Sequence, residues 1–219
     1  LGLSEPLPLA VDVACGTGMS SVALLALAER VVATDLSPEM LAQAPEHERV
    51  RYHLAPAEAL PLGDGQADLV TVSSAFHWFD RGAFLQEARR VLRAGGWLVV
   101  YENYLRGQQH PHLEVAAWAK RYYEAHPSPP RAEALFTDEN ARSAGFAFTE
   151  RLAYENSWTF TLSAFVAYLL SQSNAVAAVE AGRYTPETLK SNLAEQLEPF
   201  FSGELTFPFA GFIWLLRRT

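Results

Sequence analysis

The sequence predicts an α/β protein with a mostly parallel sheet that is covered by helices on both faces. Short apolar runs rich in β-branched residues alternate with helical segments, and this order places neighbouring strands in parallel. The runs expected to form strands are Leu9–Ala14, Arg30–Thr34, Arg51–Leu54, Asp68–Ser73 and Gly96–Glu102. Helices are expected over Gly18–Ala28, Pro38–Gln43 and Arg81–Leu92. Gly95 and Gly96 are expected to end the last of these helices and to start the following strand.

The second half of the chain departs from this alternation. Leu105–Pro130 is expected to contain a polar loop and a helix over Leu113–Ala125, which ends at a proline-rich segment. A short helix capped by Thr137 and ended by Gly145 follows. The remaining expectations are a strand over Phe146–Trp158, helices over Thr161–Ser171 and Pro186–Phe201, and a last strand over Glu204–Arg217 that is broken at Pro208.

Length and composition favour one folded domain over residues 1–219. The residues are 49% hydrophobic and carry a net charge of −8. Such an acidic chain lacks the clustered cations that phosphate contacts require, so nucleic acid is not an expected partner. No apolar run reaches the ~18 residues of a membrane span. The single cysteine, Cys15, fits a reducing cytoplasm, and the preference for arginine over lysine suggests a bacterial genome rich in G and C.

A loop of small residues follows the first predicted strand, in the segment VDVACGTG from Val11 to Gly18. Small side chains let the backbone approach a bound cofactor closely. The next predicted strand leads to Asp35, whose carboxylate can accept hydrogen bonds from both hydroxyls of an adenosine ribose. The order of strand, tight loop, helix, strand and acid is typical of a nucleotide-binding α/β unit. The segment therefore predicts an adenosine-containing cofactor.

The amino-acid pattern of this loop favours one class of cofactor. A dinucleotide-binding loop prefers a third glycine, where this sequence has Ser21. The alternative pattern, acid-x-small-x-Gly-x-Gly, is met from Asp12 to Gly18 and resembles the first motif of class I S-adenosylmethionine-dependent methyltransferases. Four later segments strengthen the resemblance: LSPEML, AEALPLGDGQADLVTV, SAFHWFD and RVLRAGGWLVVYEN. Together they are similar to the small-molecule branch of this family, such as the trans-aconitate and quinone-biosynthesis methyltransferases.

This resemblance implies a Rossmann-like methyltransferase fold, with a seven-stranded sheet whose last strand is antiparallel. The family usually has helices before the first strand, which are missing from this sequence, and the start of the chain lacks the basic residues of a signal peptide. In this family a segment in the position of residues 105–130 commonly covers the substrate side. The implied reaction is methyl transfer from S-adenosylmethionine to a small acceptor: a carboxylate, a phenol or a carbon acid.

The resemblance also implies a set of cofactor-binding residues: Asp12, Ala14, Gly16, Thr17, Gly18, Asp35, Leu36, Met40, Ala57, Glu58, Ser74 and Trp78. The two glycines would face the methionine part of the cofactor, Asp12 its ammonium group and Asp35 its ribose. Leu36 and Met40 either enclose the adenine or belong to the core.

Two positions depart from the family pattern. Ala14 stands where a glycine is usual, which costs little if its φ is negative. Pro56 stands where an acid often accepts a hydrogen bond from the adenine amino group. Proline offers neither a carboxylate nor a backbone N–H, so adenine recognition would fall to the Ala57 N–H, with Glu58 alongside.

His77 follows the fourth predicted strand, at the edge of the sheet where cofactor and acceptor must meet. It either acts as a general base or orients its loop by hydrogen bonds, because only some acceptors need a base. His110 and His112 lack the cysteine or carboxylate partners of a metal site, and methyl transfer needs no metal.

Two other functions stay open. A protein that binds S-adenosylmethionine without turnover would account for Ala14 and Pro56. A nicotinamide-dependent oxidoreductase would use Asp35 for the NAD ribose, although the missing third glycine counts against it. The oligomeric state stays open as well.

Overall fold

The computed structural model describes residues 4–129 and 136–219, so Pro130, at the end of the predicted segment 105–130, lies outside the described residues. The chain divides into two compact units. The first comprises Leu1–Glu102, Ala132–Ala153 and Phe212–Thr219, and the second comprises Asn103–Arg131 and Tyr154–Gly211. The organisation as one domain over residues 1–219 stays a prediction.

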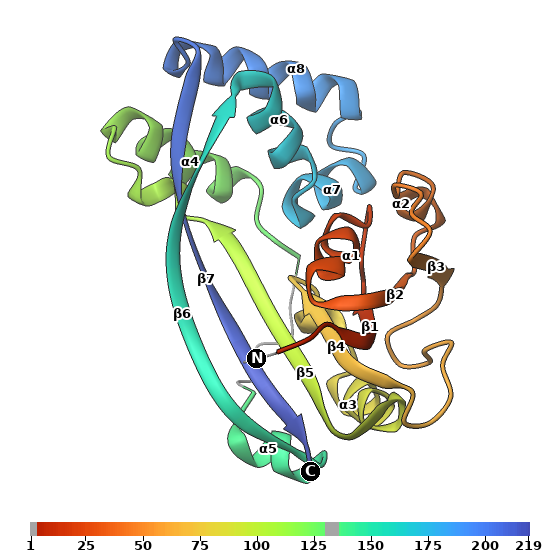
Figure 1. Ribbon diagram of the computed structural model, residues 1–219. Coiled ribbons are helices and arrows are strands. Elements are labelled where there is room, and N and C mark those ends of the chain that lie inside the picture. Colours follow the sequence, from red (N-terminus) through yellow and green to blue (C-terminus); the bar gives the residue numbers. More distant parts are fainter. Residues whose placement is uncertain (1–3, 130–135) are drawn as a thin grey trace. The chain divides into compact units, whose positions relative to one another are not determined.

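A seven-stranded sheet with the order β3-β2-β1-β4-β5-β7-β6 is the centre of the fold (Figure 1). Its strands are β1 Leu7–Val13, β2 Ala28–Asp35, β3 Val50–Leu54, β4 Ala67–Ser73, β5 Leu92–Leu105, β6 Phe146–Thr161 and β7 Glu204–Arg218. The first five pair in parallel, and the arrow of β7 runs opposite to those of β5 and β6 in Figure 1. The predicted fold class, including the antiparallel last strand, is confirmed.

The register of the parallel strands brings their carboxyl ends to one edge of the sheet. Val13 of β1 lies opposite Thr34 of β2 on one side and Val72 of β4 on the other. Val72 in turn lies opposite Val100 of β5. In open α/β sheets, ligands bind outside this edge, so the loops that leave it are the place to look for a functional site.

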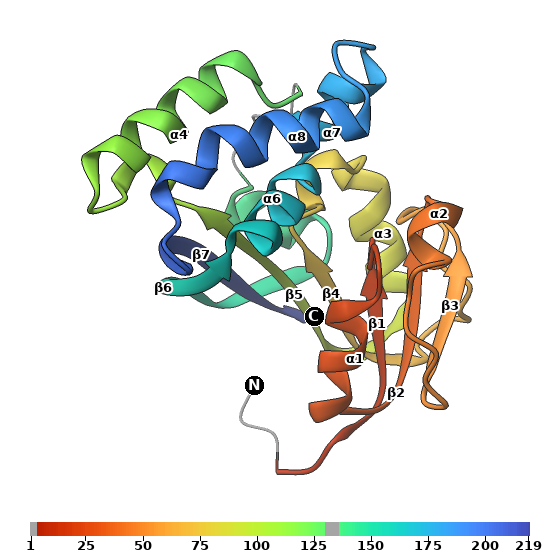
Figure 2. The same ribbon diagram turned by 90° about the horizontal axis from the view of Figure 1, so that it is seen from above.

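Helices cover both faces of the sheet in the first unit. They are α1 Met19–Ala23, α2 Pro38–Leu41, α3 Arg81–Val91 and α5 Asp138–Ser143, with single 3₁₀ turns at η1 Leu24–Ala26 and η2 Phe76–Trp78. Val11 and Val13 of β1 are buried in one cluster with Phe84 of α3, whereas Ala10 is buried in another with Leu24. Figure 2 shows α1 and α3 on opposite sides of the strands, as the alternation along β1 requires.

Several predicted boundaries in this unit were wrong. The helix expected over Gly18–Ala28 ends at Ala26, because Ala28 already pairs with Leu7 in the sheet. The helix expected over Pro38–Gln43 is a single turn that ends at Leu41. The fifth strand begins at Leu92 instead of Gly96. The register of this strand against β4 shifts after Leu92, and Gly95 has a φ of 68°. The two glycines that were expected to end the helix therefore lie in an irregular stretch at the start of the strand.

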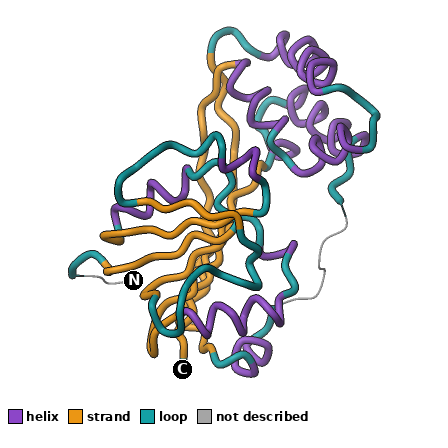
Figure 3. The backbone as a smooth tube through the Cα atoms, turned by 90° about the vertical axis from the view of Figure 1, so that its right-hand side faces the viewer, coloured by secondary structure: helices purple, strands orange, loops and turns teal. Residues whose placement is uncertain are grey.

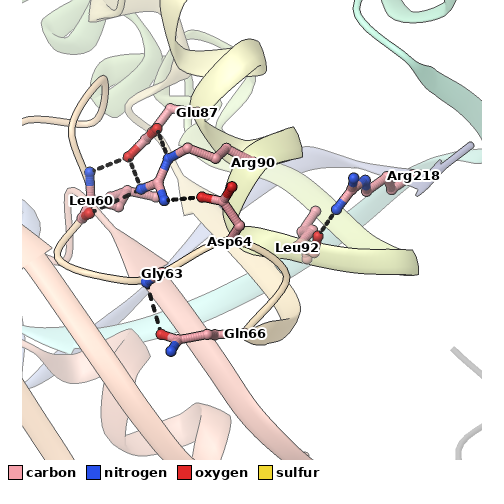
Figure 4. A network of polar contacts seen from close by, with 8 residues as sticks. All are labelled: Leu60, Gly63, Asp64, Gln66, Glu87, Arg90, Leu92 and Arg218. Carbon is pink, nitrogen blue, oxygen red and sulfur yellow. Dashed lines mark hydrogen bonds and ion pairs between the residues drawn. The ribbon is translucent and has the colours of Figure 1, made fainter.

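A polar network ties the loop before β4 to α3 (Figure 4). Glu87 accepts a hydrogen bond from the Leu60 N–H, N···Oε1 2.6 Å, and pairs with the Arg90 guanidinium, Nε···Oε2 2.7 Å. Arg90 also pairs with Asp64, and Arg93 pairs with Asp68. Arg90 of α3 and Arg93 of β5 are therefore each paired with nearby carboxylates.

The second unit consists mainly of helices, which Figure 3 draws in purple. They are α4 Leu113–Ala125, α6 Leu162–Leu170, α7 Ser173–Glu180 and α8 Pro186–Leu197, with turns at η3 Gly107–Gln109 and η4 Glu198–Phe200. Their core is aromatic: the rings of Phe165 and Phe207 stack with centroids 3.8 Å apart. The helix α4 has the predicted bounds, whereas α7 was not predicted.

The last strand is continuous through Pro208, so the predicted break is wrong. Proline removes one donor from the ladder, but the Pro208 carbonyl still accepts a hydrogen bond from the Arg106 N–H at 2.9 Å. In the described part of the chain no single helix is long and apolar enough to span a membrane. The pair α6 and α7 passes that test only jointly, by length and composition, and is bent by 65° between the two helices.

Candidate functional site

The loop Ala14–Gly18, which leaves the carboxyl end of β1, has an unusual backbone. Ala14, Gly16 and Gly18 all have positive φ, at 56°, 55° and 75°. The Cys15 N–H donates to the Thr34 carbonyl at 2.9 Å, which anchors the loop to β2. Ala14 was expected to cost little if its φ were negative; that condition is not met, and a residue with a Cβ is strained in this conformation.

The two glycines of this loop serve different purposes. A Cβ on Gly16 would meet no heavy atom within 4 Å among the described residues, so this side of the loop is open. A Cβ on Gly18 would lie only 2.5 Å from the Tyr52 hydroxyl oxygen. Gly18 is thus required by packing inside the protein, whereas Gly16 leaves space for a molecule that is bound from outside.

Asp35 lies at the end of β2 and is hydrogen-bonded to the glycine loop. Its Oδ2 accepts from the Gly16 N–H at 2.7 Å, and its Oδ1 accepts from the Ser37 N–H at 2.9 Å. Ser37 caps α2, since its hydroxyl accepts from the Met40 N–H at 3.1 Å. Each carboxylate oxygen has a further lone pair, so Asp35 can still accept two hydrogen bonds from a ligand.

Asp12 is fully buried beneath the first turn of α1. Its carboxylate accepts hydrogen bonds from three hydroxyls: Ser20 and Ser21, both at 2.7 Å, and Thr71 at 3.0 Å. Burial raises the pKa of Asp12 above its ordinary value, while the three hydroxyls oppose this shift. Asp12 therefore braces the glycine loop and the start of α1 from inside the protein.

Large apolar side chains are exposed around this edge of the sheet. Leu36 is 69% exposed and Met40 38%, which excludes the alternative that they belong to the core. Met19, the first residue of α1, is 74% exposed, and Leu54, the last residue of β3, is 61% exposed. Sequence reasoning missed both residues, although Met19 directly follows the glycine loop and Leu54 ends a predicted strand. Exposed apolar residues that gather at one edge are typical of a ligand site.

The loop after β3 is tied to the loop after β4. The side chain of Ala57 is buried in the core against α3, and Thr17 of the glycine loop is half-buried. The Glu58 carboxylate accepts a hydrogen bond from the Asp80 N–H at 3.1 Å. Glu58 thereby holds the entry of α3, in addition to any contact with a ligand.

The loop after β4 carries Ser74, His77 and Trp78. Ser74 is exposed with φ 52°, and its N–H donates to the Tyr101 carbonyl at 2.9 Å. The His77 Nδ1 lies 3.0 Å from Oε1 of Glu102 on β5. Trp78 is 45% exposed, with its ring centroid 4.7 Å from that of His77. The expected candidates Ser74, His77 and Trp78 therefore lie at the same edge as the glycine loop.

The remaining polar candidates have structural roles. Cys15 is buried, and burial raises the pKa of its thiol to about 12, so it behaves as an apolar filler. His110, in the second unit, donates from Nε2 to the Thr206 carbonyl, and its Nδ1 accepts from the His112 N–H. Burial lowers the pKa of His110. Within residues 4–129 and 136–219 no group of three or more histidine, cysteine or acidic side chains is arranged to hold a metal ion.

Known proteins resemble this chain in sequence. Residues 11–100 match the family described as "Methyltransferase domain". The ubiquinone/menaquinone biosynthesis C-methyltransferase of Rubrivivax gelatinosus is 31% identical over 188 residues, which cover 78% of this chain and 72% of that protein. The malonyl-[acyl-carrier protein] O-methyltransferase of Hahella chejuensis is 40% identical over 95 residues, 41% of this chain and 34% of that protein.

A methyltransferase-named protein of Dictyostelium discoideum is 32% identical over 120 residues, 55% of this chain and 46% of its own length. An uncharacterized methyltransferase of Mycobacterium bovis is 39% identical over 97 residues, 42% of this chain and 39% of its own length. This chain thus spans less than half the length of either relative. Among solved structures, one described as a type II methyltransferase from Anaeromyxobacter dehalogenans superposes with a TM-score of 0.68 at 27% identity, over 96% of this chain and 89% of that one.

Proposed function

Because this chain belongs to the family of class I S-adenosylmethionine-dependent methyltransferases, we propose that it transfers a methyl group from S-adenosylmethionine to a small organic acceptor. The proposal rests mainly on the hydrogen bond between the Gly16 N–H and the Asp35 carboxylate. At this contact the loop has open space beside it, and the carboxylate has lone pairs left for a ligand. The bound sulfonium would supply an already activated methyl group. The protein then has to hold acceptor, methyl carbon and sulfur in line and to exclude water.

We assign the cofactor contacts as follows. Asp35 accepts hydrogen bonds from the ribose hydroxyls, and the exposed side chains of Leu36 and Met40 enclose the adenine. The Ala57 N–H and Glu58 lie beside the adenine edge. This assignment is supported by the exposure of the two apolar side chains, because burial against a flat aromatic ring would remove them from water.

The methionine part of the cofactor is assigned to the glycine loop, where Ala14, Gly16, Thr17 and Gly18 present their backbone. Asp12 is buried behind Ser20, so it acts on the ammonium group through the loop and not by direct contact. Ser74 and Trp78, which leave the neighbouring strand β4, complete the site towards the acceptor.

The acceptor is proposed to be a carboxylate, a phenol or a carbon acid. One relative is named as a C-methyltransferase and another as an O-methyltransferase, which supports carbon or oxygen as the attacking atom. The net charge of −8 argues against nucleic acid as the acceptor. A single buried cysteine supports a cytoplasmic protein, and the arginine preference supports a bacterial source.

Calorimetry with S-adenosylmethionine and, separately, NADH tests the cofactor. We expect saturable binding of S-adenosylmethionine and S-adenosylhomocysteine and no binding of NADH; the opposite result would support the oxidoreductase alternative. Release of S-adenosylhomocysteine is then measured with a panel of carboxylates, phenols and carbon acids. Binding of S-adenosylmethionine without turnover on the panel or on a metabolite extract would identify a non-catalytic binding protein.

A further inference from the structure

His77 and Glu102 form a hydrogen-bonded pair in the first unit. The Nδ1 of His77 lies 3.0 Å from Oε1 of Glu102, and the two side chains are only 12% and 22% exposed. An ionised carboxylate can only accept a hydrogen bond, so in the neutral imidazole the proton is on Nδ1. The other ring nitrogen, Nε2, then carries a lone pair.

The lone pair of Nε2 is accessible. Within residues 4–129 and 136–219, no group donates a hydrogen bond to Nε2. Buried polar atoms that lack a partner do not include Nε2, so this atom is in contact with solvent. The ring of Trp78 lies beside the imidazole and limits its rotation. This arrangement, with one nitrogen fixed by a carboxylate and the other open, is the form of histidine that accepts a proton.

The sheet register holds this pair at the edge that carries the glycine loop. Ser73 of β4 lies opposite Tyr101 of β5, which places Glu102 one residue beyond the last pair. The hydrogen bond from the Ser74 N–H to the Tyr101 carbonyl fixes the start of the loop that leads to His77. On its other side β4 pairs with β1 up to Val72 and Val13, directly before the glycine loop.

We propose that Glu102 is a positioning residue that holds His77 as a general base, and that the acceptor loses a proton during methyl transfer. The acceptor class is therefore a phenol or a carbon acid, and not a carboxylate. This inference rests on the proposed function. A carboxylic acid is already ionised at neutral pH, so it has no proton for a base to remove.

The acceptor oxygen or carbon forms its bond to the methyl carbon with the electron pair of its O–H or C–H bond, and the proton passes to Nε2 of His77. The bond that breaks joins the methyl carbon to sulfur, and its electron pair stays on sulfur. The imidazolium is stabilised by the Glu102 carboxylate until its proton passes to solvent.

Nuclear magnetic resonance on the full chain with ¹⁵N-labelled histidine tests the pair without requiring turnover. We expect the neutral His77 ring to be in the Nδ1–H tautomer, with and without S-adenosylhomocysteine. In Glu102→Gln we expect a mixture of tautomers, because an amide can either accept or donate. Glu150→Gln, an exposed acid elsewhere in the first unit, is the matched control and should leave the His77 signals unchanged.

Transfer of tritiated methyl from S-adenosylmethionine into a metabolite extract tests the acceptor class. Mild alkali releases label from a methyl ester but not from a methyl ether or a C-methyl product, and a methylated amine stays in acidic water during extraction. We expect alkali-stable label that is extracted from acid into organic solvent. His77→Gln should lower the rate by about 10²–10⁴-fold, and Glu102→Gln by about tenfold or more, whereas His47→Gln should leave it unchanged.

The outcomes separate this inference from the proposed function. Label released by alkali, or a His77→Gln rate equal to that of the parent, would overturn the base while leaving methyl transfer intact. An Nε2–H tautomer in the parent would overturn the pair. If S-adenosylmethionine neither binds to the parent nor labels any metabolite, the proposed function itself fails.

Discussion

The backbone N–H of Gly16 donates a hydrogen bond to the Asp35 carboxylate, N···Oδ2 2.7 Å. The loop after β1 and the acid at the end of β2 are therefore one structure and not two independent motifs. The open space beside Gly16 lies next to an acid that already orders the loop. Any molecule that binds there with a hydroxyl group meets a carboxylate whose position is set in advance, which lowers the entropic cost of binding.

Asp35→Asn is expected to weaken S-adenosylmethionine binding by about tenfold or more. Hydrogen bonds to a charged group contribute ~1.5–3 kcal/mol each, and the neutral amide keeps only one acceptor oxygen. Calorimetry gives the dissociation constant, and circular dichroism checks that the variant is folded. Glu29→Gln, an exposed acid near the start of β2, is the control. An Asp35→Asn dissociation constant equal to that of the parent would rule out the ribose role.

Ala14→Gly is expected to stabilise the protein. The positive φ of 56° costs a residue with a Cβ roughly 1–2 kcal/mol, and the added backbone entropy of glycine offsets about 0.5–1 kcal/mol of the gain. The free energy of unfolding should therefore rise by about 0.5–1 kcal/mol in urea denaturation. Ala33→Gly, a buried alanine in β2, should instead lower it. No gain, or a loss, in Ala14→Gly would contradict the strained conformation.

Gly16→Ala and Gly18→Ala should fail in different ways. Both glycines have positive φ, so both substitutions cost backbone strain. The Gly18 methyl would also overlap the Tyr52 hydroxyl, so Gly18→Ala should unfold at a lower temperature than Gly16→Ala. Gly16→Ala should fold and lose affinity for S-adenosylmethionine. Thermal unfolding and calorimetry distinguish the two effects; an equal loss of stability in both variants would show that Tyr52 yields without cost.

Cys15 is expected to resist alkylation in the native state. With a pKa of about 12, only about one thiol in ten thousand is ionised at pH 8. Iodoacetamide at this pH should therefore modify the native protein at least about a hundredfold more slowly than the protein unfolded in guanidinium. The reaction is followed by mass spectrometry. Comparable rates in the two states would mean that Cys15 is not buried as the structure has it.

Glu87→Gln should lower stability at neutral pH but not in acid. Hydrogen bonds from Arg90 hold the pKa of Glu87 below its ordinary value. Its contribution is therefore present above the unfolded pKa of ~4.3 and is lost as pH falls through the lower folded value. We expect a loss of about 1 kcal/mol in the free energy of unfolding at pH 7. Urea denaturation of the parent and the variant at pH 7 and at pH 3 checks this. If the variant loses the same free energy of unfolding at both pH values, the charged pair does not stabilise the protein.

Local sequence patterns determined much of this protein. The parallel strands, the tight loop after β1 and the caps at Ser37 and Thr137 follow from neighbouring residues, because β-branched runs, small residues and capping hydroxyls act over a few positions. The resemblance to a methyltransferase rests on the same local motifs.

The tertiary structure decided what depends on distant partners. The helix after the glycine loop stops early because Ala28 pairs with Leu7, and a register shift against β4 starts β5 before its glycines. The positive φ of Ala14 is imposed by the loop and was not visible in the sequence. The pairing of His77 with Glu102 joins residues separated by 25 positions. Strand register brings these two side chains together, and register is set by the packing of the whole sheet and not by the residues that it places in contact.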